Sequence, residues 1–408
     1  MTYNELYKLL ENHGQTHLLK YWDELSEESK ASLTKQIENI DWKLLDILKN
    51  RSEIENRGVL APLGALEIDE IEARKEEFEK VGIEAIKAGK VGAVLLAGGQ
   101  GTRLGSDKPK GMYNIGITHP LYIFECLINN MMDVVKQAGA WMPLCIMTSE
   151  KNNDDTVAFF EEMNYFGYNK DYVNFFVQEM APSVDYNGKI YMEGKDRISL
   201  SPNGNGGWFT SLEKAGLVEK LEKQGVEWLT IFAVDNVLQR INSPAFVGAT
   251  IASGRQSGAK VVRKAEPMEK IGVLCLEDNK PSIVEYYEIT DDMINLRDER
   301  GELLYSFGVI LNYMFNIEVL KSNMHKRMPL HIVEKKIPYI DENAQLVKPE
   351  APNGYKFETL ILDMIHMHSS CLPYEVERNN EFAPVKNKTG VDSVESARKL
   401  LTENGVEI

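Results

Sequence analysis

Cysteine is scarce in this chain, and positive charge is in the minority. The 408 residues include four cysteines, and none has the spacing of a Cys-x-x-Cys or Cys/His zinc site: Cys126, Cys145, Cys275 and Cys371. Few, scattered cysteines are typical of reduced thiols in the cytosol, so we expect a cytoplasmic protein. The 46 basic residues are outnumbered by 62 acidic ones, which gives a formal net charge of −16. This excess disfavours nucleic acid and anionic membranes as partners, so a phosphate ligand requires a local basic cluster or a metal ion.

Targeting segments, long apolar runs, repeats and low-complexity stretches are missing as well. The N-terminal sequence "MTYNELYKLLENHG" has no basic stretch followed by an apolar one, so we expect no signal peptide. No apolar run approaches the ~20 residues that span a bilayer, so we expect no membrane partner. The chain is 43% hydrophobic and 26% charged, which is typical of a globular protein with a sizeable core.

The order of apolar patterns predicts an α/β protein. Residues 1–88 have helical spacing throughout, with Ser26 as an expected N-cap and one amphipathic helix over 67–89. From residue 91, short apolar runs alternate with helical patterns, which favours a mostly parallel sheet with right-handed crossovers. The expected strands are 91–97, 142–148, 173–178 and 226–236. The expected helices between these strands are 119–139, 153–167 and 208–225. Residues 259–290 are rich in β-branched and aromatic residues around turns, so we expect inserted antiparallel strands there.

A glycine-rich turn follows the first apolar run: residues 95–116 read "LLAGGQGTRLGSDKPKGMYNIG". The turn is not a P-loop, because no Gly-Lys-Ser/Thr occurs, and it is not a G-x-G-x-x-G fingerprint, because Leu104 stands where the third glycine is required. Its composition nevertheless indicates phosphate binding. Gly98 and Gly99 can turn their amides toward an anion, Arg103 can fork onto phosphate oxygens, and Lys110 adds a point charge. The alternative is a surface turn with solvated cations.

The motifs around this turn resemble those of the UDP-sugar pyrophosphorylases (UDPGP type 1), most closely the UDP-N-acetylglucosamine enzymes. The resemblance rests on "LAGGQGTRLG" followed by "PKGMY", and continues through "FFVQEM", "SLSPNGNGG", "VDN", "GAKVV", "VEYYEI", "KKIPYID", "PNGYKFE" and "YEVERNNEFAPVKN". It covers about residues 60–390. It implies a Rossmann-like nucleotidyltransferase domain over 89–390, preceded by the helical region 1–88 and followed by a short tail, 391–408.

The resemblance also implies a reaction. UTP and a sugar 1-phosphate would give a UDP-sugar and pyrophosphate, by in-line attack of the sugar phosphate oxygen on the α-phosphorus of UTP. No side-chain nucleophile is required, so catalysis would rest on positioning and charge neutralisation. A further C-terminal domain of eukaryotic members has no counterpart in this sequence, and we therefore expect a monomer.

Residue roles follow from the matching motif positions on the nucleotide side. Gly98 and Gly99 would lie against the uridine, and Gln178 would read the uracil edge, since an amide can donate and accept at once. Arg103 and Lys110 would contact the UTP phosphates and the leaving pyrophosphate, and we expect both side chains to be exposed in the empty cleft. The alternative for Gln178 is a strand-end residue that bonds to the backbone.

Two charged residues complete the phosphate side of the implied site. Asp235, at the end of an expected strand, matches a carboxylate that holds Mg²⁺ against the α-phosphate. The alternative is that Asp235 caps a helix. Lys386, in "PVKN", matches a lysine that contacts phosphate. Its alternative is an ordinary surface lysine.

The sugar side involves a second group of positions. Gly204 and Asn205 match a loop that touches nucleotide and sugar, or else form a plain turn. Gly272 matches a backbone contact to the sugar. Glu285 matches the acid that binds sugar hydroxyls, with a cross-strand ion pair as the alternative.

Three departures from the family pattern lie near the expected sugar pocket. Val309 stands where the N-acetylglucosamine enzymes have a hydroxyl-binding asparagine, and Leu360 and Leu362 replace two aromatic residues near the acetamido group. We therefore expect uridylyl transfer to N-acetylglucosamine 1-phosphate with weakened sugar preference. The alternatives are a UTP–glucose-1-phosphate or galactose-1-phosphate uridylyltransferase of the same family, and a non-catalytic sensor of UDP-sugars.

Overall fold

The computed structural model describes residues 1–49, 57–323 and 328–408. The chain forms two compact units, which we call the small and the large unit. The small unit comprises Met1–Asn56, Glu179–Gly207 and Met328–Leu360, and the large unit comprises Arg57–Gln178, Trp208–Arg327 and Ile361–Ile408. These units divide the chain differently from the boundaries expected from the sequence (1–88, 89–390 and 391–408), because two later segments pack with the N-terminal helices.

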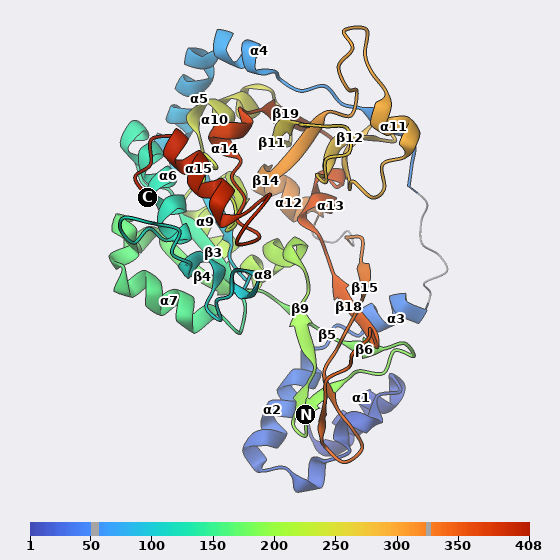
Figure 1. Ribbon diagram of the computed structural model, residues 1–408. Coiled ribbons are helices and arrows are strands. Elements are labelled where there is room, and N and C mark those ends of the chain that lie inside the picture. The colour runs from blue at the N-terminus through green and yellow to red at the C-terminus, as the bar shows by residue number, and fades with distance from the viewer. Residues whose placement is uncertain (50–56, 324–327) are drawn as a thin grey trace. The chain divides into compact units, whose positions relative to one another are not determined.

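The small unit combines N-terminal helices with strands from two later segments (Figure 1). Its helices are α1 (Tyr3–Asn12), α2 (Glu27–Glu38) and α3 (Lys43–Lys49), and the expected cap is confirmed by a 3.1 Å bond from the Ser29 amide to Ser26 Oγ. Its strands are β5 (Met180–Pro182), β6 (Val184–Asp185), β7 (Met192–Gly194), β8 (Arg197–Ile198), β9 (Leu200–Pro202), β15 (His331–Lys335), β16 (Tyr339–Ile340), β17 (Leu346–Val347) and β18 (Gly354–Glu358). Apolar residues of all three segments share one core, among them Leu10, Ile37, Ile198 and Phe357.

The N-terminal region is less uniformly helical than the sequence predicts. Strand β1 (Leu60–Pro62) pairs with a strand of the large unit's sheet. The single helix expected over 67–89 is two helices, α4 (Ile68–Ala73) and α5 (Lys75–Lys87), which meet at Arg74 outside helical geometry. Residues 50–56 of the expected helical region lie outside the described residues.

The large unit is built on a sheet whose centre is parallel, as predicted. Strands β10 (Trp228–Ala233), β2 (Val91–Leu96), β3 (Leu144–Thr148) and β4 (Val173–Val177) lie side by side in that order, and each adjacent pair is parallel. Every residue of β2 and β3 is buried. Strands covered on both faces read as continuous apolar runs, and this explains why the sequence alone located them.

Antiparallel strands extend the same sheet, as expected for residues 259–290. Strand β14 (Phe307–Asn316) pairs with β10, and β11 (Ser257–Arg263) and β12 (Val273–Glu277) both pair with β14. Strand β13 (Lys280–Val284) pairs with β12, and β19 (Cys371–Glu375) lies parallel to β11. The fold class predicted from the sequence is thereby confirmed.

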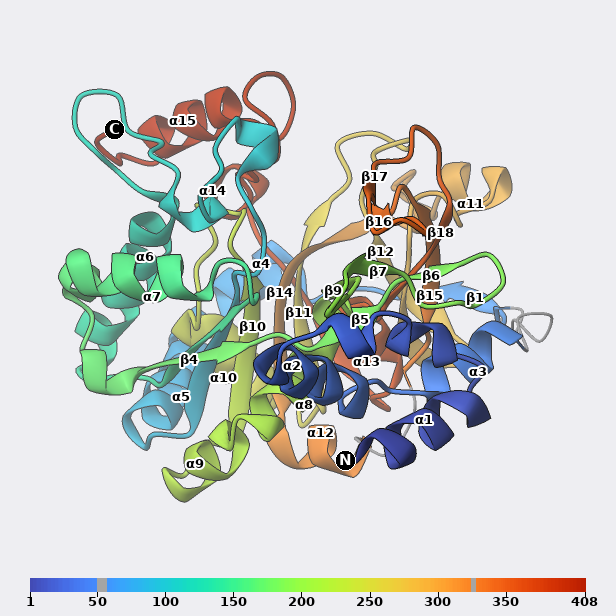
Figure 2. The ribbon, with the colours of Figure 1, turned by 90° about the horizontal axis from the view of Figure 1, so that it is seen from below.

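Helices of the large unit pack around this sheet (Figure 2). Helices α5 and α10 (Pro244–Ala252) lie side by side, and only glycine fits at their contact: a Cβ at Gly82 would lie 2.0 Å from the Pro244 oxygen. The helix expected over 208–225 is two helices, because Gly216 adopts a φ of 72° between them. The remaining helices are α6 (Ile123–Ala138), α7 (Asn153–Glu162), α8 (Trp208–Lys214), α9 (Leu217–Lys223), α11 (Asp291–Asn295), α12 (Ile317–Asn323), α13 (Ile361–His366), α14 (Arg378–Glu381) and α15 (Val394–Glu403). Among the described residues, no helix has both the length and the apolar character needed to cross a membrane.

Candidate active site

The parallel strands of the large unit end together at one edge of the sheet. Ala233, Leu96, Met147 and Phe176 form one row of paired residues across β10, β2, β3 and β4. Strands β2, β4 and β10 are each followed within two residues by a position that the sequence assigned to the site. Ligands of open α/β sheets bind at this carboxyl edge, so the topology gathers the glycine turn, Gln178 and Asp235 where a ligand is expected.

The glycine turn after β2 is held by its own backbone. The Lys110 amide donates to the Gly99 oxygen at 3.1 Å, and the Gly101 amide donates to the Lys108 oxygen at 2.9 Å. The buried Asn152 fastens the start of the turn, because its Nδ2 donates to the Ala97 oxygen at 2.9 Å. These bonds hold the backbone of Lys110 beside Gly99, close to the end of β2.

The glycines of the turn are required for different reasons. A Cβ at Gly98 would lie 3.0 Å from Gln178 Oε1, so Gly98 allows the buried glutamine to reach the turn. A Cβ at Gly101 would lie 3.0 Å from the Lys108 oxygen, a contact within the turn itself. At Gly99 a Cβ would meet no heavy atom within 4 Å. Protein packing therefore does not explain this glycine, and its backbone is open to the close approach of a ligand.

Opposite charges meet beside the turn. Lys110 Nζ lies 3.9 Å from Asp235 Oδ2, and the two side chains are only 16% and 27% exposed. The expectation that Lys110 is exposed is therefore wrong, because the turn folds its side chain toward the loop after β10. Arg103 is exposed, as expected. Burial lowers the pKa of Lys110, Asp235 opposes this shift, and the charges of Lys386 and Arg103 add to it.

The segment that carries Lys386 is joined to the loop that carries Asp235. The Val385 amide donates to the Asp235 oxygen at 2.8 Å. The buried Asn236 bonds twice to the same segment, donating to the Glu381 oxygen and accepting from the Ala383 amide, both at 2.8 Å. The Lys386 side chain is 43% exposed and pairs with Asp392 Oδ2 at 2.9 Å. The backbone thus places Asp235 and Lys386 close together although 151 positions separate them in the sequence.

A buried ion pair helps to hold the segment from Glu381 to Lys386 against the loop that carries Asp235. Lys260, on β11, is fully buried, and its Nζ lies 2.5 Å from Glu381 Oε2 and 2.7 Å from the Arg240 oxygen. Glu381 Oε2 also accepts from the Arg240 amide at 3.2 Å. A buried charge is tolerated when it is paired and hydrogen-bonded. We therefore regard Lys260 and Glu381 as positioning residues for the Asp235 loop.

The predicted sugar contacts of the large unit form a second group. A Cβ at Gly272 would lie 3.6 Å from Val309 Cγ2 and 3.7 Å from the Glu285 carboxyl carbon, and the Val309 amide donates to the Gly272 oxygen at 2.9 Å. Strand β14 runs antiparallel to β10 with Asn312 opposite Phe232, so the first half of β14 lies where β10 ends. The register of β14 with β10 therefore places the predicted sugar-binding residues at the same edge of the sheet as Lys110 and Asp235.

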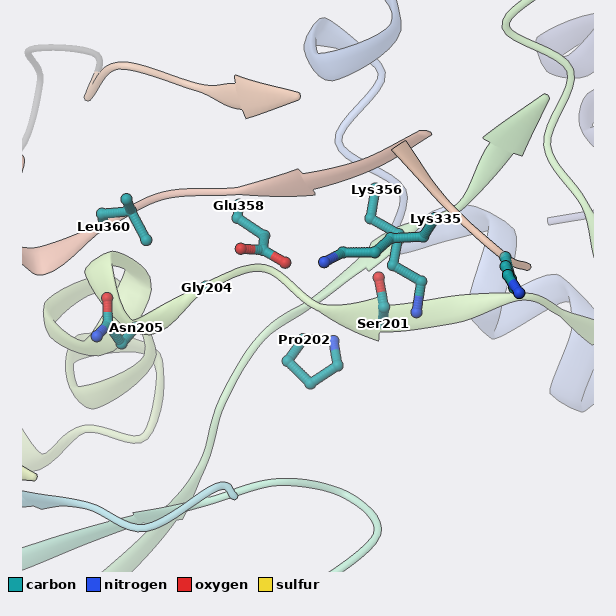
Figure 3. A pocket seen from close by; sticks show the side chains of 9 residues that line it. Ser201, Pro202, Gly204, Asn205, Lys335, Lys356, Glu358 and Leu360 are labelled. Atoms are coloured by element: carbon teal, nitrogen blue, oxygen red, sulfur yellow. The ribbon is translucent and has the colours of Figure 1, made fainter. Parts of the chain in front are cut away.

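Gly204 and Asn205 belong to the small unit, where they line a hollow of about 690 Å³ together with Leu360 (Figure 3). Gly204 has a φ of 88°, and a Cβ there would lie 2.2 Å from the Thr359 oxygen. Packing against Thr359, the residue after β18, thus explains this glycine without a ligand. Leu362 lies on α13 of the large unit.

Several residues near the site carried no sequence-based role. Asn152, Lys260 and Glu381 act through buried bonds, and a buried polar residue has no distinctive local pattern. The motifs "GAKVV" and "NNEFAPVKN" contain Lys260 and Glu381, but only the folded chain pairs them. Lys335, Lys356 and Glu358 also line the hollow of the small unit and likewise lay in motifs without an assigned role.

The lowered pKa of Lys110 predicts an alkaline limb in the rate profile. Loss of the Lys110 proton would remove a charge that the sequence motifs assign to phosphate binding, so kcat/KM for the nucleotide should begin to fall at a lower pH than an ordinary lysine would allow. In Lys110→Arg the limb should move to higher pH, because arginine keeps its proton. An identical limb in wild type and Lys110→Arg would show that another group titrates.

The parallel edge, the glycine turn and the cation cluster are together typical of α/β proteins that bind nucleotide phosphates. The family model described as UTP–glucose-1-phosphate uridylyltransferase matches residues 26–406. The chain therefore belongs to this family of UDP-sugar pyrophosphorylases, as the sequence motifs predicted.

Named relatives and a solved structure agree with this assignment. A human UDP-N-acetylhexosamine pyrophosphorylase-like protein 1 is 36% identical, over 97% of this chain and 83% of its own. The UDP-N-acetylglucosamine pyrophosphorylase of Saccharomyces cerevisiae is 34% identical, over 94% of this chain and 86% of its own. The crystal structure of the Trypanosoma brucei uridine diphosphate N-acetylglucosamine pyrophosphorylase with an inhibitor is similar at a TM-score of 0.85 and 29% identity, covering 98% of this chain and 84% of that one.

Proposed function

We propose that this chain transfers the uridylyl group of UTP to N-acetylglucosamine 1-phosphate, and that it requires Mg²⁺. The observation that supports the proposal most strongly is the pairing of Lys110 with Asp235 at 3.9 Å, beside the turn whose Gly99 backbone is open. A cation and a carboxylate at one phosphate-binding edge are the two charges that phosphoryl chemistry needs.

In this reaction a phosphate oxygen of the sugar 1-phosphate attacks the α-phosphorus of UTP. The bond from the α-phosphorus to the bridging oxygen breaks, and pyrophosphate leaves with the electron pair. Lys110, Arg103 and Lys386 would neutralise the charge that gathers on the phosphates, and their mutual repulsion in the free protein would be relieved by the bound anion. Gln178, held against Gly98, would orient the base.

The residues present fit a magnesium ion that is shared with the substrate. No group of three or more His, Cys, Asp or Glu side chains lies within metal-binding reach of one another among the described residues. Mg²⁺ typically takes one or two carboxylates and completes its shell with water and substrate phosphates, so Asp235 alone suffices on the protein side. When bound, the ion would supply charge stabilisation at the α-phosphate.

The relatives named for N-acetylglucosamine or N-acetylhexosamine support the choice of sugar, and Val309 limits its discrimination. Val309 and Glu285 both lie beside Gly272, and the Val309 side chain can offer a sugar hydroxyl no hydrogen bond. One missing hydrogen bond to a neutral hydroxyl costs about 0.5–1.5 kcal/mol, or roughly three- to twelvefold in rate. The preference for N-acetylglucosamine should therefore be weakened but not lost.

We expect uridylyl transfer to N-acetylglucosamine 1-phosphate with only modest preference over the glucose, galactose and N-acetylgalactosamine 1-phosphates. The measurement is kcat/KM for all four sugars, in wild type and in Val309→Asn, which should sharpen the preference by roughly three- to twelvefold. A wild-type preference above about a thousandfold would contradict the weakened selection. An unchanged profile in Val309→Asn would show that Val309 does not touch the sugar.

A further inference from the structure

Glu285, which the sequence assigned to the sugar, lies at one end of a β-hairpin. Strands β12 and β13 pair antiparallel, so Gly272, just before β12, and Glu285, just after β13, lie side by side. A Cβ at Gly272 would be 3.7 Å from the Glu285 carboxyl carbon. The position of this carboxylate therefore depends on what holds the backbone at residue 285.

Glu288 fastens both backbone groups of Glu285. Its carboxylate accepts from the Glu285 amide, at 2.9 Å to Oε2, and its own amide donates to the Glu285 oxygen at 2.8 Å. The two residues between them, Tyr286 and Tyr287, are 41% and 66% exposed, so the burial of these side chains does little to fix the turn. The direction of the Glu288 side chain thus controls where Glu285 stands.

Arg57 holds the Glu288 carboxylate from a distant part of the chain. Its guanidinium forks onto Glu288, with Nε 3.0 Å from Oε1 and Nη2 2.7 Å from Oε2. Nη2 also donates to the Ile283 oxygen at 3.3 Å, two residues before Glu285. In the part of the chain that the structure describes, no other cation forms an ion pair with Glu288. A planar contact with two prongs fixes the direction of a carboxylate as well as its distance.

Arg57 is itself fixed in place. Its Nη1 lies 3.1 Å from Glu277 Oε2, and the same carboxylate accepts from the Gly58 amide at 2.9 Å and from the Ser282 hydroxyl at 2.7 Å. Strand β1 follows and pairs with β12. The side chains of Arg57 and Glu277 are only 32% and 13% exposed. Water and salt therefore screen this ion pair less than they screen a pair on an open surface.

We propose that Arg57 is a positioning residue for Glu285 and thereby sets the affinity of the chain for the sugar. This inference rests on the proposed function, because Glu285 acts on a sugar only if the chain binds one. Without Arg57, the carboxylates of Glu288 and Glu277 would lose the cation that they share, and like charges repel. Glu288 would then turn toward water and release the Glu285 amide, so that Glu285 would no longer be held beside Gly272.

The test compares UDP-N-acetylglucosamine with UDP, which lacks only the sugar, by calorimetric titration of the full chain. Arg57→Gln should weaken the binding of UDP-N-acetylglucosamine about tenfold or more, because a hydrogen-bonding carboxylate is misplaced. Its affinity for UDP should stay within about two- to threefold of wild type. Unchanged binding of UDP-N-acetylglucosamine by Arg57→Gln, or an equal loss for both ligands, would overturn the proposal.

Matched variants separate positioning from a general effect on stability. Arg74 forms the same two-pronged contact with Glu77, at 2.9 and 2.7 Å, where α4 and α5 meet. Arg74→Gln should therefore bind both ligands like wild type. Arg57→Lys keeps the charge but not the fork, so it should regain part of the affinity that Arg57→Gln loses.

A second variant keeps the test valid if Arg57→Gln does not fold. Glu288→Gln removes the ion pair with Arg57 and leaves Arg57 bonded to Glu277. It should also weaken the binding of UDP-N-acetylglucosamine and spare that of UDP. Equal binding of both ligands by Glu288→Gln and wild type would then overturn the proposal.

Hydrogen exchange followed by mass spectrometry tests the same link without a ligand. The peptide that contains the Glu285 amide should exchange faster in Arg57→Gln than in wild type, and at the wild-type rate in Arg74→Gln. Equal exchange in wild type and Arg57→Gln would overturn the positioning role. If wild type binds UDP-N-acetylglucosamine without turnover, the proposed reaction fails while both tests of Arg57 stand. If wild type binds no UDP-sugar, the sugar role of Arg57 fails as well, and the exchange rates still decide whether Arg57 holds the turn.

Discussion

Replacing Lys110 by alanine should lower kcat/KM for UTP by about two orders of magnitude or more. The Lys110 ammonium lies 3.9 Å from Asp235 and is repelled by Lys386 and Arg103, so in the proposed reaction it would neutralise phosphate charge. Removing one preorganised charge from a transition-state site typically costs about a hundred- to a thousandfold. Steady-state kinetics with UTP as the varied substrate measures the loss.

A neighbouring lysine of the same turn provides the matched control. Lys108 is 61% exposed and pairs with Asp155 at 3.5 Å, away from Asp235. Lys108→Ala should keep kcat/KM within a few-fold of wild type. Near-wild-type kinetics in Lys110→Ala, or equal losses in the two variants, would refute the role assigned to Lys110. Lys110 is largely buried, so circular dichroism must first show that Lys110→Ala is folded.

Replacing Asp235 by asparagine should abolish most of the Mg²⁺-dependent activity while base recognition remains. The carboxylate would hold the metal against the phosphates, whereas Gln178 and the glycine turn would hold the uracil. Calorimetry with uridine or UMP should give an affinity close to that of wild type, although turnover is lost.

Asp133→Asn, at a carboxylate that is 60% exposed on α6, is the control and should leave both properties unchanged. The separation of roles fails if Asp235→Asn loses its affinity for UMP together with its activity. It also fails if activity persists in the absence of Mg²⁺.

The elements that the sequence predicted well are those defined by their own residues. Strand β2 (Val91–Leu96) reads as an apolar run because both of its faces are covered, and α6 ends at Gly139, whose φ of 65° favours glycine. The break between α8 and α9 was missed, because the apolar spacing continues across Gly216 and only the backbone angle there ends the first helix.

Features that depend on distant pairings were not predictable in the same way. The small unit gathers three separate segments around Phe357 and the N-terminal helices, and no local pattern indicates that assembly. The burial of Lys110 was also missed, because it arises from a loop 125 positions further along the chain.

The candidate site was predicted through its motifs more than through its chemistry. Glycines, cations and Asp235 could be assigned because the turn and the strand ends carry recognisable residues. Lys260 and Glu381 could not, because a buried lysine becomes meaningful only when its partner is known. Lys335 and Lys356 share a face only through the register of β15 with β18.

We expect the chain to convert UTP and a sugar 1-phosphate rather than merely to bind a UDP-sugar. The most direct measurement incubates the purified chain with UTP, N-acetylglucosamine 1-phosphate and Mg²⁺, and quantifies UDP-N-acetylglucosamine and pyrophosphate over time. We predict that both products form in equal amounts, and that neither forms appreciably with Asp235→Asn. Tight binding of UDP-N-acetylglucosamine without formation of either product, from any of the four sugar 1-phosphates, would contradict the account and identify a sensor of UDP-sugars.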